Sequence, residues 1–506
     1  MDSLFANAWI GLSVALLPGN LLMALTGVLL GTLIGVLPGI GPLATMAMLL
    51  PVTFHATPEG AIILLAGIYY GAQYGGSTTA ILVNMPGETS SAVTCIDGHQ
   101  MAKQGRAGPA LALAAIGSLV GGVVSLLVIM TLAEPLSRFA VSLRPADYFA
   151  IICFGLIGST LLGRSTMLKS VGMILLGVLL GLIGTDVASG RLRFTFGFDQ
   201  LYEGLEFTAV AVGLFGLPEI LRNLAAGSGA GQDAGPAAVA PIGPMMPSRR
   251  ELRQAAPAML RGSLIGSVLG ILPGGGAMLS SFTSYAVERR LARDPSRFGR
   301  GAVEGVAGPE TANNAGAQTS FIPMLALGLP SNAIMAILIG ALMIQGIAPG
   351  PNIMSEQPAL IWGLIMSMFV GNVMLVVINL PLIGLWVRLL RTPYRLLFPA
   401  IVLMCCIGVY SINSSAFDVV LTMVLGLFGY ALLQFGCEPA PLVLGMLLGP
   451  MMEENFRRAM QLANGDPTTF VRHPVSLVFL IASVAMLAMI AAPALRRRRE
   501  EVFQDD

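Results

Sequence analysis

The chain has 506 residues, of which 55% are hydrophobic and 11% are charged, whereas charged residues make up about a quarter of a typical soluble domain. Its 28 lysines and arginines nearly balance its 27 aspartates and glutamates, so it lacks the basic surface that binding to nucleic acid requires. The composition excludes a soluble enzyme, a disordered protein and a nucleic-acid-binding module. It predicts an all-α polytopic membrane protein embedded in the lipid bilayer.

Long uncharged segments recur along the chain. No Asp, Glu, Lys or Arg occurs between Asp2 and Glu59 or between Glu310 and Glu356. A helix that crosses the bilayer needs about 20 apolar residues, and the apolar stretches of this chain suffice for roughly ten to fourteen crossings. We therefore expect a multi-pass protein.

Two Pro-Gly sequences interrupt apolar stretches. The first is LPGIGP at 37–42 and the second is LPGGG at 272–276. Proline lacks a backbone donor and glycine disfavours helix, so each helix should break within the membrane and leave backbone groups unpaired. Paired interruptions of this kind indicate a substrate or ion site in transporters. The alternative is a packed hairpin or kink satisfied by neighbouring helices.

Neutral polar side chains accompany both interruptions. Amides and hydroxyls can bind a carboxylate or a cation such as sodium, although they also serve as hydrogen bonds between helices, worth about 1 kcal/mol each. Two interpretations stay open for Glu88 and Glu310: ion ligands or proton carriers, and interfacial carboxylates, of which we favour the second. The candidate substrate-binding or ion-binding residues are Gly39, Gly41, Ser77, Thr78, Thr79, Asn84, Pro86, Gly87, Gly274, Gly275, Asn313, Asn314, Ser331 and Asn332.

The sequence repeats itself at long range. Residues 27–41 read GVLLGTLIGVLPGIG and residues 262–276 read GSLIGSVLGILPGGG, so every glycine of the first copy and its proline recur at an offset of 235. The four-residue glycine spacing predicts close helix packing. Farther on, 84–88 corresponds to 328–332 at an offset of 244. Internal duplication is typical of secondary transporters, whose copies often have opposite orientation.

The duplication predicts two homologous, inverted repeats with broken or re-entrant helices. Five arginines crowd residues 289–300 of the second copy, whereas the matching stretch after Thr53 has none. Basic loops of membrane proteins usually face the cytoplasm. Because only one of the two matching loops is basic, the two repeats are expected to have opposite orientations, with the arginines in the cytoplasm. The predicted domains are a first transmembrane repeat at 1–222, a flexible linker at 223–256, a second repeat at 257–495 and a cytoplasmic tail at 496–506.

Catalytic motifs are missing from the sequence. The three histidines lie far apart, with no HExxH pair, and there is no GxxxxGK[ST] phosphate loop. The five cysteines have no CxxC spacing and predict no disulfide framework. We predict no enzyme, no cofactor and no identifiable metal site. A channel-like or scaffold subunit and an intramembrane enzyme are the alternatives to a transporter, and the paired interruptions favour the transporter.

Several segments resemble one known family, the large membrane subunit of tripartite tricarboxylate transporters, of the TctA type. The similarity covers nearly the whole chain. The matching segments are GVLPGIGPL (35–43), YYGAQYGGSTTAILVNMPGE (69–88), DGHQMAKQGRAGPAL (97–111), IGTD (183–186), RFTFG (193–197), ANNAGAQ (312–318) and LVLGMLLGPMMEENFRRAM (442–460).

The resemblance implies a multi-pass carrier of the bacterial inner membrane. It further implies two partners, a small four-helix membrane subunit and a periplasmic solute-binding protein. Members of the family take up citrate and other carboxylates, driven by a gradient of a coupling cation, sodium or protons.

Overall fold

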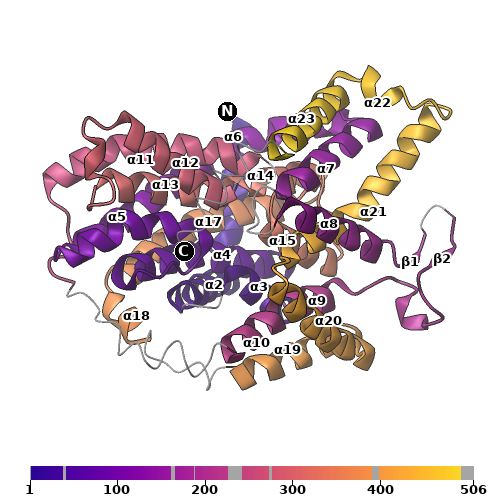
Figure 1. The fold of residues 1–506 in the computed structure, drawn as a ribbon, viewed down its shortest axis with the longest axis horizontal. Helices are drawn as coiled ribbons and strands as arrows, with labels where there is room; N and C mark the ends of the chain where they lie inside the picture. Colours follow the sequence, from indigo (N-terminus) through magenta and orange to yellow (C-terminus); the bar gives the residue numbers. More distant parts are fainter. Residues whose placement is uncertain are drawn as a thin grey trace.

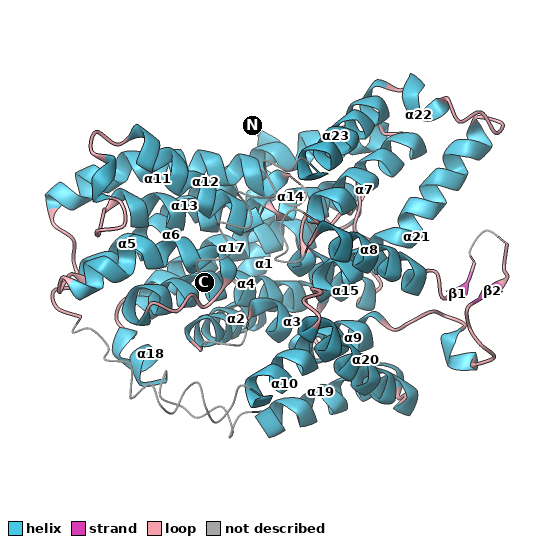
Figure 2. Ribbon diagram, in the orientation of Figure 1, coloured by secondary structure: helices cyan, strands magenta, loops and turns pink. Residues whose placement is uncertain are grey.

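The computed structural model describes residues 2–37, 41–160, 166–186, 189–225, 242–272, 276–389 and 398–491. This part of the chain is almost entirely helical (Figure 2), and its one sheet is the two-stranded antiparallel pair β1 (Gly184–Thr185) and β2 (Leu192–Arg193). The sequence-based prediction of a helical membrane protein agrees with this architecture.

Figure 1 shows how the helices follow one another along the chain. The first half contains α1 (Asp2–Ala15), α2 (Pro18–Val36), α3 (Pro42–Thr53), α4 (Pro58–Val83), η1 (Thr89–Ser91), α5 (Ala92–Lys103), α6 (Ala107–Ser142), α7 (Pro145–Ser159), α8 (Met167–Gly181), η2 (Asp199–Leu201), α9 (Phe207–Ala211), η3 (Val212–Gly216) and α10 (Leu217–Ala225). The second half contains α11 (Arg249–Ile271), α12 (Gly276–Leu291), η4 (Pro295–Arg297), α13 (Glu304–Thr319), α14 (Phe321–Leu327), α15 (Ala333–Ile344), α16 (Ile353–Glu356), α17 (Pro358–Asn379), α18 (Ile383–Leu389), α19 (Phe398–Asn413), α20 (Ala416–Gln434), α21 (Pro439–Leu462), α22 (Thr469–Arg472) and α23 (Pro474–Ala491).

Among the described residues, four helices are long and apolar enough to cross a bilayer: α2, α6, α17 and α20. Six shorter apolar helices of 10–17 residues accompany them. In the most apolar 18-residue segment of α20, only 28% is buried within the protein. A helix so apolar and so exposed needs an apolar solvent, which a lipid bilayer supplies.

Small residues let α2 lie directly against α4. A Cβ atom on Gly31 would clash with the carbonyl oxygen of Ile68, and Gly27 and Gly35 meet carbonyl oxygens one turn before and after it. Backbone contact of this kind requires glycine on the approaching face. The packing role predicted for the glycine spacing is therefore confirmed in this helix pair.

The same packing occurs between α11 and α13. A Cβ on Gly266 would clash with the carbonyl oxygen of Ala312, and Gly262 and Gly270 meet the carbonyl oxygens one turn away on either side. The glycines of α11 lie 235 residues after those of α2 in the sequence. The carbonyl groups of α13 that they meet lie 244 residues after those of α4. Both helix pairs thus have the same contact pattern.

Each apolar stretch is interrupted at its Pro-Gly sequence. Leu37, after α2, has extended backbone, and so does Gly41, which precedes α3. Leu272 is extended after α11, and α12 begins at Gly276 with a φ of 63°. Residues 38–40 and 273–275 lie outside the described part of the chain, and with them the candidate residues Gly39, Gly274 and Gly275.

The turns after α4 and α14 share backbone conformations. Asn84 has a φ of 58° and Gly328 a φ of 70°, both in the left-handed region, and each ends a helix. Four residues later, Glu88 and Asn332 are extended, with φ of −150° and −156°, and each caps the next helix. Asn84 and Gly328, like Glu88 and Asn332, are 244 residues apart, which is the offset between the two copies in the sequence.

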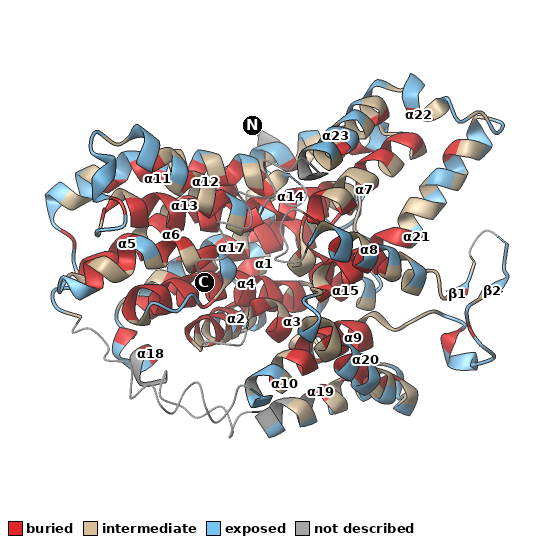
Figure 3. Ribbon diagram, in the orientation of Figure 1, coloured by how far each residue is buried: buried red, intermediate tan, exposed pale blue. Residues whose placement is uncertain are grey.

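Helices α4 and α13–α14 run antiparallel through the centre. Ser77 of α4 bonds Glu310, whereas Tyr69, two turns earlier on α4, lies against Phe321, which is later in the chain than Glu310. Figure 3 shows these helices almost completely buried. The N-terminal ends of α4 and α13 are therefore at opposite ends of the molecule.

The predicted linker at 223–256 is only partly described. Residues 223–225 complete α10, residues 226–241 are outside the described part, and α11 begins at Arg249. Ser248 caps α11 by accepting a hydrogen bond from Glu251 N. Helical structure thus begins inside the predicted linker, and the predicted tail at 496–506 is outside the described residues.

A substitution on α2 tests the close packing. Gly31→Ala would force α2 and α4 apart, and we expect it to lower the free energy of unfolding by about 1–3 kcal/mol, the usual cost of overpacking. Gly19→Ala, on the same helix, is the control, because nothing lies within 4 Å of its added Cβ. Thermal unfolding in detergent measures both. Equal melting temperatures for the two variants would contradict the contact.

Candidate functional site

A buried carboxylate lies where α4, α5 and α13 meet. Glu310 of α13 has no solvent exposure. One of its oxygens accepts a hydrogen bond from Ser77 Oγ of α4 at 2.6 Å, and the other accepts one from Thr94 of α5. Three helices therefore enclose the Glu310 side chain, which is not exposed at a surface of the protein.

A second polar layer lies one helical turn away. The Glu88 carboxylate, half-buried, bonds the Ser90 hydroxyl, which is also 3.0 Å from Gln73 Oε1. Asn313, one turn after Glu310, is fully buried and interacts with Glu88, but neither polar atom of its side chain has a well-aligned hydrogen-bond partner. The polar core is defined as Gln73, Ser77, Glu88, Ser90, Thr94, Glu310 and Asn313.

The polar core contains two carboxyl groups, Glu88 and Glu310, without a basic partner among the described residues. Glu88 and Glu310 interact electrostatically with each other. In the described part of the chain, neither forms an ion pair with a lysine, arginine or histidine. Ionisable groups buried in membrane segments without a partner usually mark the path of an ion or a proton.

Buried amides extend the polar core toward α6 and α17. Asn314 donates to Ser118 Oγ of α6 at 2.7 Å. Gln318 accepts from Ser125 Oγ and donates to Asn372 Oδ1 of α17, both at 3.1 Å. The C-terminal half of α13 thus carries buried amides at Asn313, Asn314 and Gln318.

The structure brings together only some of the predicted residues. Ser77 and Asn313 lie in the polar core, and Asn314 is adjacent to it. Thr78 and Thr79 instead donate to backbone carbonyls of their own helix.

The remaining described candidates lie at the interruptions and turns. Ser331 donates to Ser320 O at 3.3 Å, and Asn332 caps α15. Asn84 and Pro86 are exposed at the turn after α4, and Gly87 is buried, packed against the Gly35 carbonyl where α2 ends. None of these side chains makes a hydrogen bond to the polar core.

A small cavity adjoins Glu310. Its volume is about 20 Å³, enough for one water-sized species. The sequence-based reasoning missed three residues here: Thr94, which bonds Glu310, and Ser118 and Asn379, which line the cavity. Ser118 and Asn379 were signalled only as polar residues within apolar helices, and Thr94, in the polar helix α5, had no distinguishing signal. The polar residues lining the cavity are Tyr74, Ser77, Thr78, Ser118 and Asn379.

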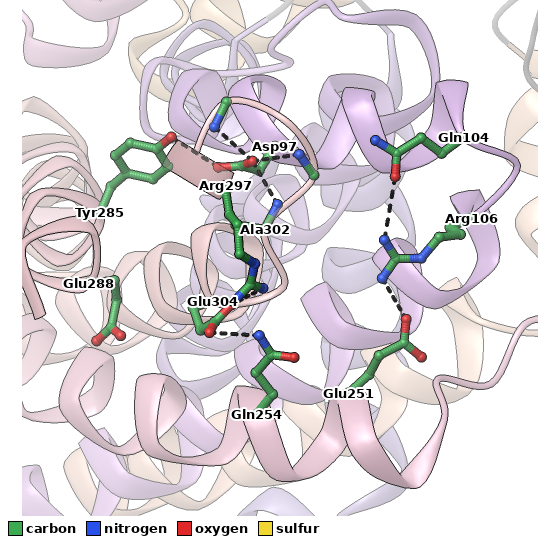
Figure 4. Close-up of polar contacts among 12 residues, drawn as sticks. Asp97, Gln104, Arg106, Glu251, Gln254, Tyr285, Glu288, Arg297, Ala302 and Glu304 are labelled. Carbon is green, nitrogen blue, oxygen red and sulfur yellow. Dashed lines mark hydrogen bonds and ion pairs between the residues drawn. The ribbon is translucent and has the colours of Figure 1, made fainter. Parts of the chain in front are cut away.

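At one end of the molecule, Asp97 of α5 anchors the arginine loop, defined as residues 292–303 (Figure 4). Its Oδ1 accepts hydrogen bonds from the backbone N–H groups of Gly299, Gly301 and Ala302 at 2.8–2.9 Å, and its Oδ2 accepts one from Tyr285 at 2.9 Å. Backbone donors satisfy this buried carboxylate without a cation. The two halves of the chain are thereby joined at this end.

Charged side chains surround the same end. Gln104 donates to Arg300 O at 2.8 Å. Arg106 pairs with Glu251 at 2.6 Å (Figure 4). Burial raises the pKa of Glu251, but hydrogen bonds from Arg106 and Ser248 lower it by more, so that the pKa lies below its ordinary value. These residues border a polar cavity of about 790 Å³ beside the arginine loop.

The opposite end has a similar but simpler contact. Gln345, which follows α15, donates to Thr53 O at 2.7 Å and to Ala56 O at 3.3 Å. Gln104 and Gln345 each follow a helix, have nearly the same backbone angles and precede a glycine of positive φ. Each glutamine bonds a loop of the other half.

Comparison with known proteins identifies the class. Residues 21–444 match the family model described as the tripartite tricarboxylate transporter TctA family. The chain belongs to the TctA family. It is therefore a membrane transport subunit of the tricarboxylate class and not an enzyme.

Two proteins of Agrobacterium vitis are similar to this TctA chain. One, described as an uncharacterized 52.8 kDa protein in the TAR-I ttuC' 3'region, is 51% identical over 506 residues, all of both chains. The other, described as an uncharacterized protein in the TAR-II ttuC' 3'region, is 54% identical over 241 residues, 48% of this chain and 100% of the relative. No solved structure matches this TctA chain.

Replacing Asp97 tests its role at the arginine loop. Asp97→Asn removes the negative charge that the three backbone donors stabilise, and we expect a local loss of about 2 kcal/mol. The loop should then be cleaved faster by trypsin at its arginines. Tyr285→Phe removes one of the four hydrogen bonds and should have a smaller effect. Unchanged cleavage in Asp97→Asn would show that the loop is held by other contacts.

Proposed function

We propose that this TctA chain is the large transmembrane subunit of a binding-protein-dependent secondary transporter. It takes up tricarboxylates or related carboxylates into the bacterial cell, driven by a gradient of sodium or protons. Its partners are a small four-helix membrane subunit and a periplasmic solute-binding protein. One observation carries this proposal. The polar core, whose two carboxyl groups have no basic partner among the described residues, lies beside two interrupted helices in the centre of an apolar protein.

The arrangement of the two halves supports inverted repeats. Equivalent helices α4 and α13 run antiparallel, and the glycine contacts of α2 with α4 recur between α11 and α13 at fixed offsets. The contact of Gln104 with Arg300 also has its counterpart, at the other end, in the contact of Gln345 with Ala56. Inverted repeats of this kind allow a transporter to expose a central site alternately to each side.

The interruptions supply the groups for binding a carboxylate. No lysine or arginine precedes Lys103 in the sequence, so binding in the first half depends on neutral groups. Helices α3 and α12 begin at the interruptions, and the N–H groups of a helix N-terminus attract anions. We assign substrate binding to the two interruptions: to Gly41 and the predicted Gly39 at the first, and to the predicted Gly274 and Gly275, with Ser331 and Asn332, at the second.

Energy coupling is the direct test of this function. In right-side-out membrane vesicles that contain the chain with its partner subunits and binding protein, carboxylate uptake should follow an imposed sodium or proton gradient. ATP should have no effect, because the chain has no phosphate loop. Uptake that ATP supports after all ion gradients have collapsed would refute a secondary transporter.

Gly41→Val separates a binding role from a packing role in the same assay. Among the described residues, nothing lies within 4 Å of a Cβ added at Gly41, and its φ of −76° suits a side chain. We expect lost uptake at normal abundance and normal melting temperature, because the side chain would obstruct the approach of substrate to the backbone. Gly19→Val on exposed surface is the control. Uptake that falls only in proportion to protein level would place Gly41 outside the site.

Labelling of single cysteines tests the inverted orientation. In a cysteine-free background, His55→Cys and Ser296→Cys report on the two ends, and both positions are exposed. A membrane-impermeant maleimide added from the periplasm should label the first and leave the second unlabelled, because the arginine loop faces the cytoplasm. Periplasmic labelling at Ser296→Cys would reject this orientation.

A further inference from the structure

Glu310 is a carboxyl group of the polar core without a positive partner among the described residues. The side chain is completely enclosed, and within the described part of the chain its two oxygens are bonded only by the neutral hydroxyls of Ser77 and Thr94. Two hydroxyl donors reduce the cost of burying a carboxylate, but they do not supply the positive charge that offsets it in a medium of low dielectric constant. A positive species near Glu310 would remove this cost.

The adjoining cavity supplies space for such a species. Ser77 both lines the cavity and bonds Glu310 at 2.6 Å, so the cavity begins one hydroxyl away from the carboxylate. Its volume of about 20 Å³ admits a single small species. The cavity also lies against the apolar side chains of Leu111, Leu380 and Ile383.

Unsatisfied oxygens surround this space. Tyr74 and Asn379 line the cavity with 4% and 5% exposure, and Tyr74 Oη and Asn379 Oδ1 have no hydrogen-bond partner. The Asn379 amide nitrogen is already engaged with Leu375 O at 2.9 Å, which leaves its oxygen free toward a ligand. Tyr74 also interacts electrostatically with Glu310.

We infer that this cavity binds one dehydrated sodium ion. Tyr74, Ser77, Ser118 and Asn379 supply its neutral oxygen ligands, and Glu310 balances its charge. Hard cations prefer oxygen ligands. A single nearby carboxylate suits a monovalent ion, since calcium and magnesium sites generally use more ligands or retain several waters. The inference rests on the proposed function, for which it names the coupling ion and its site.

Two other occupants explain only part of these observations. A proton on Glu310 neutralises the charge, but it leaves Tyr74 Oη and Asn379 Oδ1 without partners. A water molecule satisfies these two oxygens and leaves the charge of Glu310 unbalanced. A cation in the cavity satisfies both requirements.

Thermal unfolding of the purified full-length chain in detergent tests the site. Sodium chloride is titrated against N-methylglucamine chloride at constant ionic strength, with potassium chloride as a second comparison. Because the ion binds the folded state, the melting temperature should rise with sodium and approach saturation. Glu310→Gln should abolish the rise, and Tyr74→Phe should increase the sodium concentration at half effect by about tenfold, the usual scale for loss of a supporting ligand.

Two matched controls isolate the cavity. Tyr70→Phe removes another buried, unpartnered hydroxyl on α4 that lies against Gly371 instead of the cavity. Glu304→Gln removes a carboxylate from α13 outside the polar core. Both should keep the wild-type response to sodium. Tyr74→Phe breaks no hydrogen bond within the described residues, so it should fold even if Glu310→Gln does not.

The outcomes separate the three occupants. The titratable groups facing Glu310 are Tyr74 and Glu88. No response to sodium, with a pH dependence that Glu310→Gln removes, assigns a proton and overturns the inference. No response to sodium or pH assigns water and also overturns it. Gradient-driven uptake without sodium binding would refute the sodium site and leave the proposed function standing. Sodium binding without uptake would support the sodium site and refute the proposed function.

Discussion

Backbone contact between helices is the constraint on which the rest of this structure depends. Because Gly35 lets α2 reach the backbone of α4 near Ala72 and Gly76, the end of α2 lies directly beside the turn that carries Gly87 and Glu88. The interruption after α2 is thereby fixed next to the polar core. A larger residue at these positions would separate the broken helix from the polar groups of α4, so packing and function depend on the same small side chains.

The central helices combine two properties that usually conflict. Helices α4 and α13 are almost completely buried, yet both carry hydroxyl, amide or carboxyl groups. These groups satisfy one another between helices, as Ser77 does with Glu310. The helices α2, α6 and α17, which pack against them or against each other, are apolar enough to cross a bilayer. The apolar helices therefore enclose a polar interior that no single helix could maintain in a bilayer.

Much of the architecture could be predicted from sequence because its signals are local. The apolar composition, the glycine spacing and the Pro-Gly interruptions each depend on residues close together in the chain. The burial of Glu310 could not be predicted, since it results from the contact of α13 with α4 and α5. Ser118 and Asn379 were missed for the same reason: each is one of several polar residues in an apolar helix, and only the helix arrangement brings both to one cavity. The role of Asp97 could not be predicted either, because the loop that it bonds lies about 200 residues away in the sequence.

The two ends of the molecule are held with unequal strength. Asp97 and Gln104 make five hydrogen bonds to α12 and the arginine loop, whereas Gln345 makes two to the loop after α3. If the halves exchange conformations, opening the arginine end costs more than opening the other. In the absence of ligand, the conformational equilibrium is then biased toward the state closed at the arginines, and ligand binding must supply the difference.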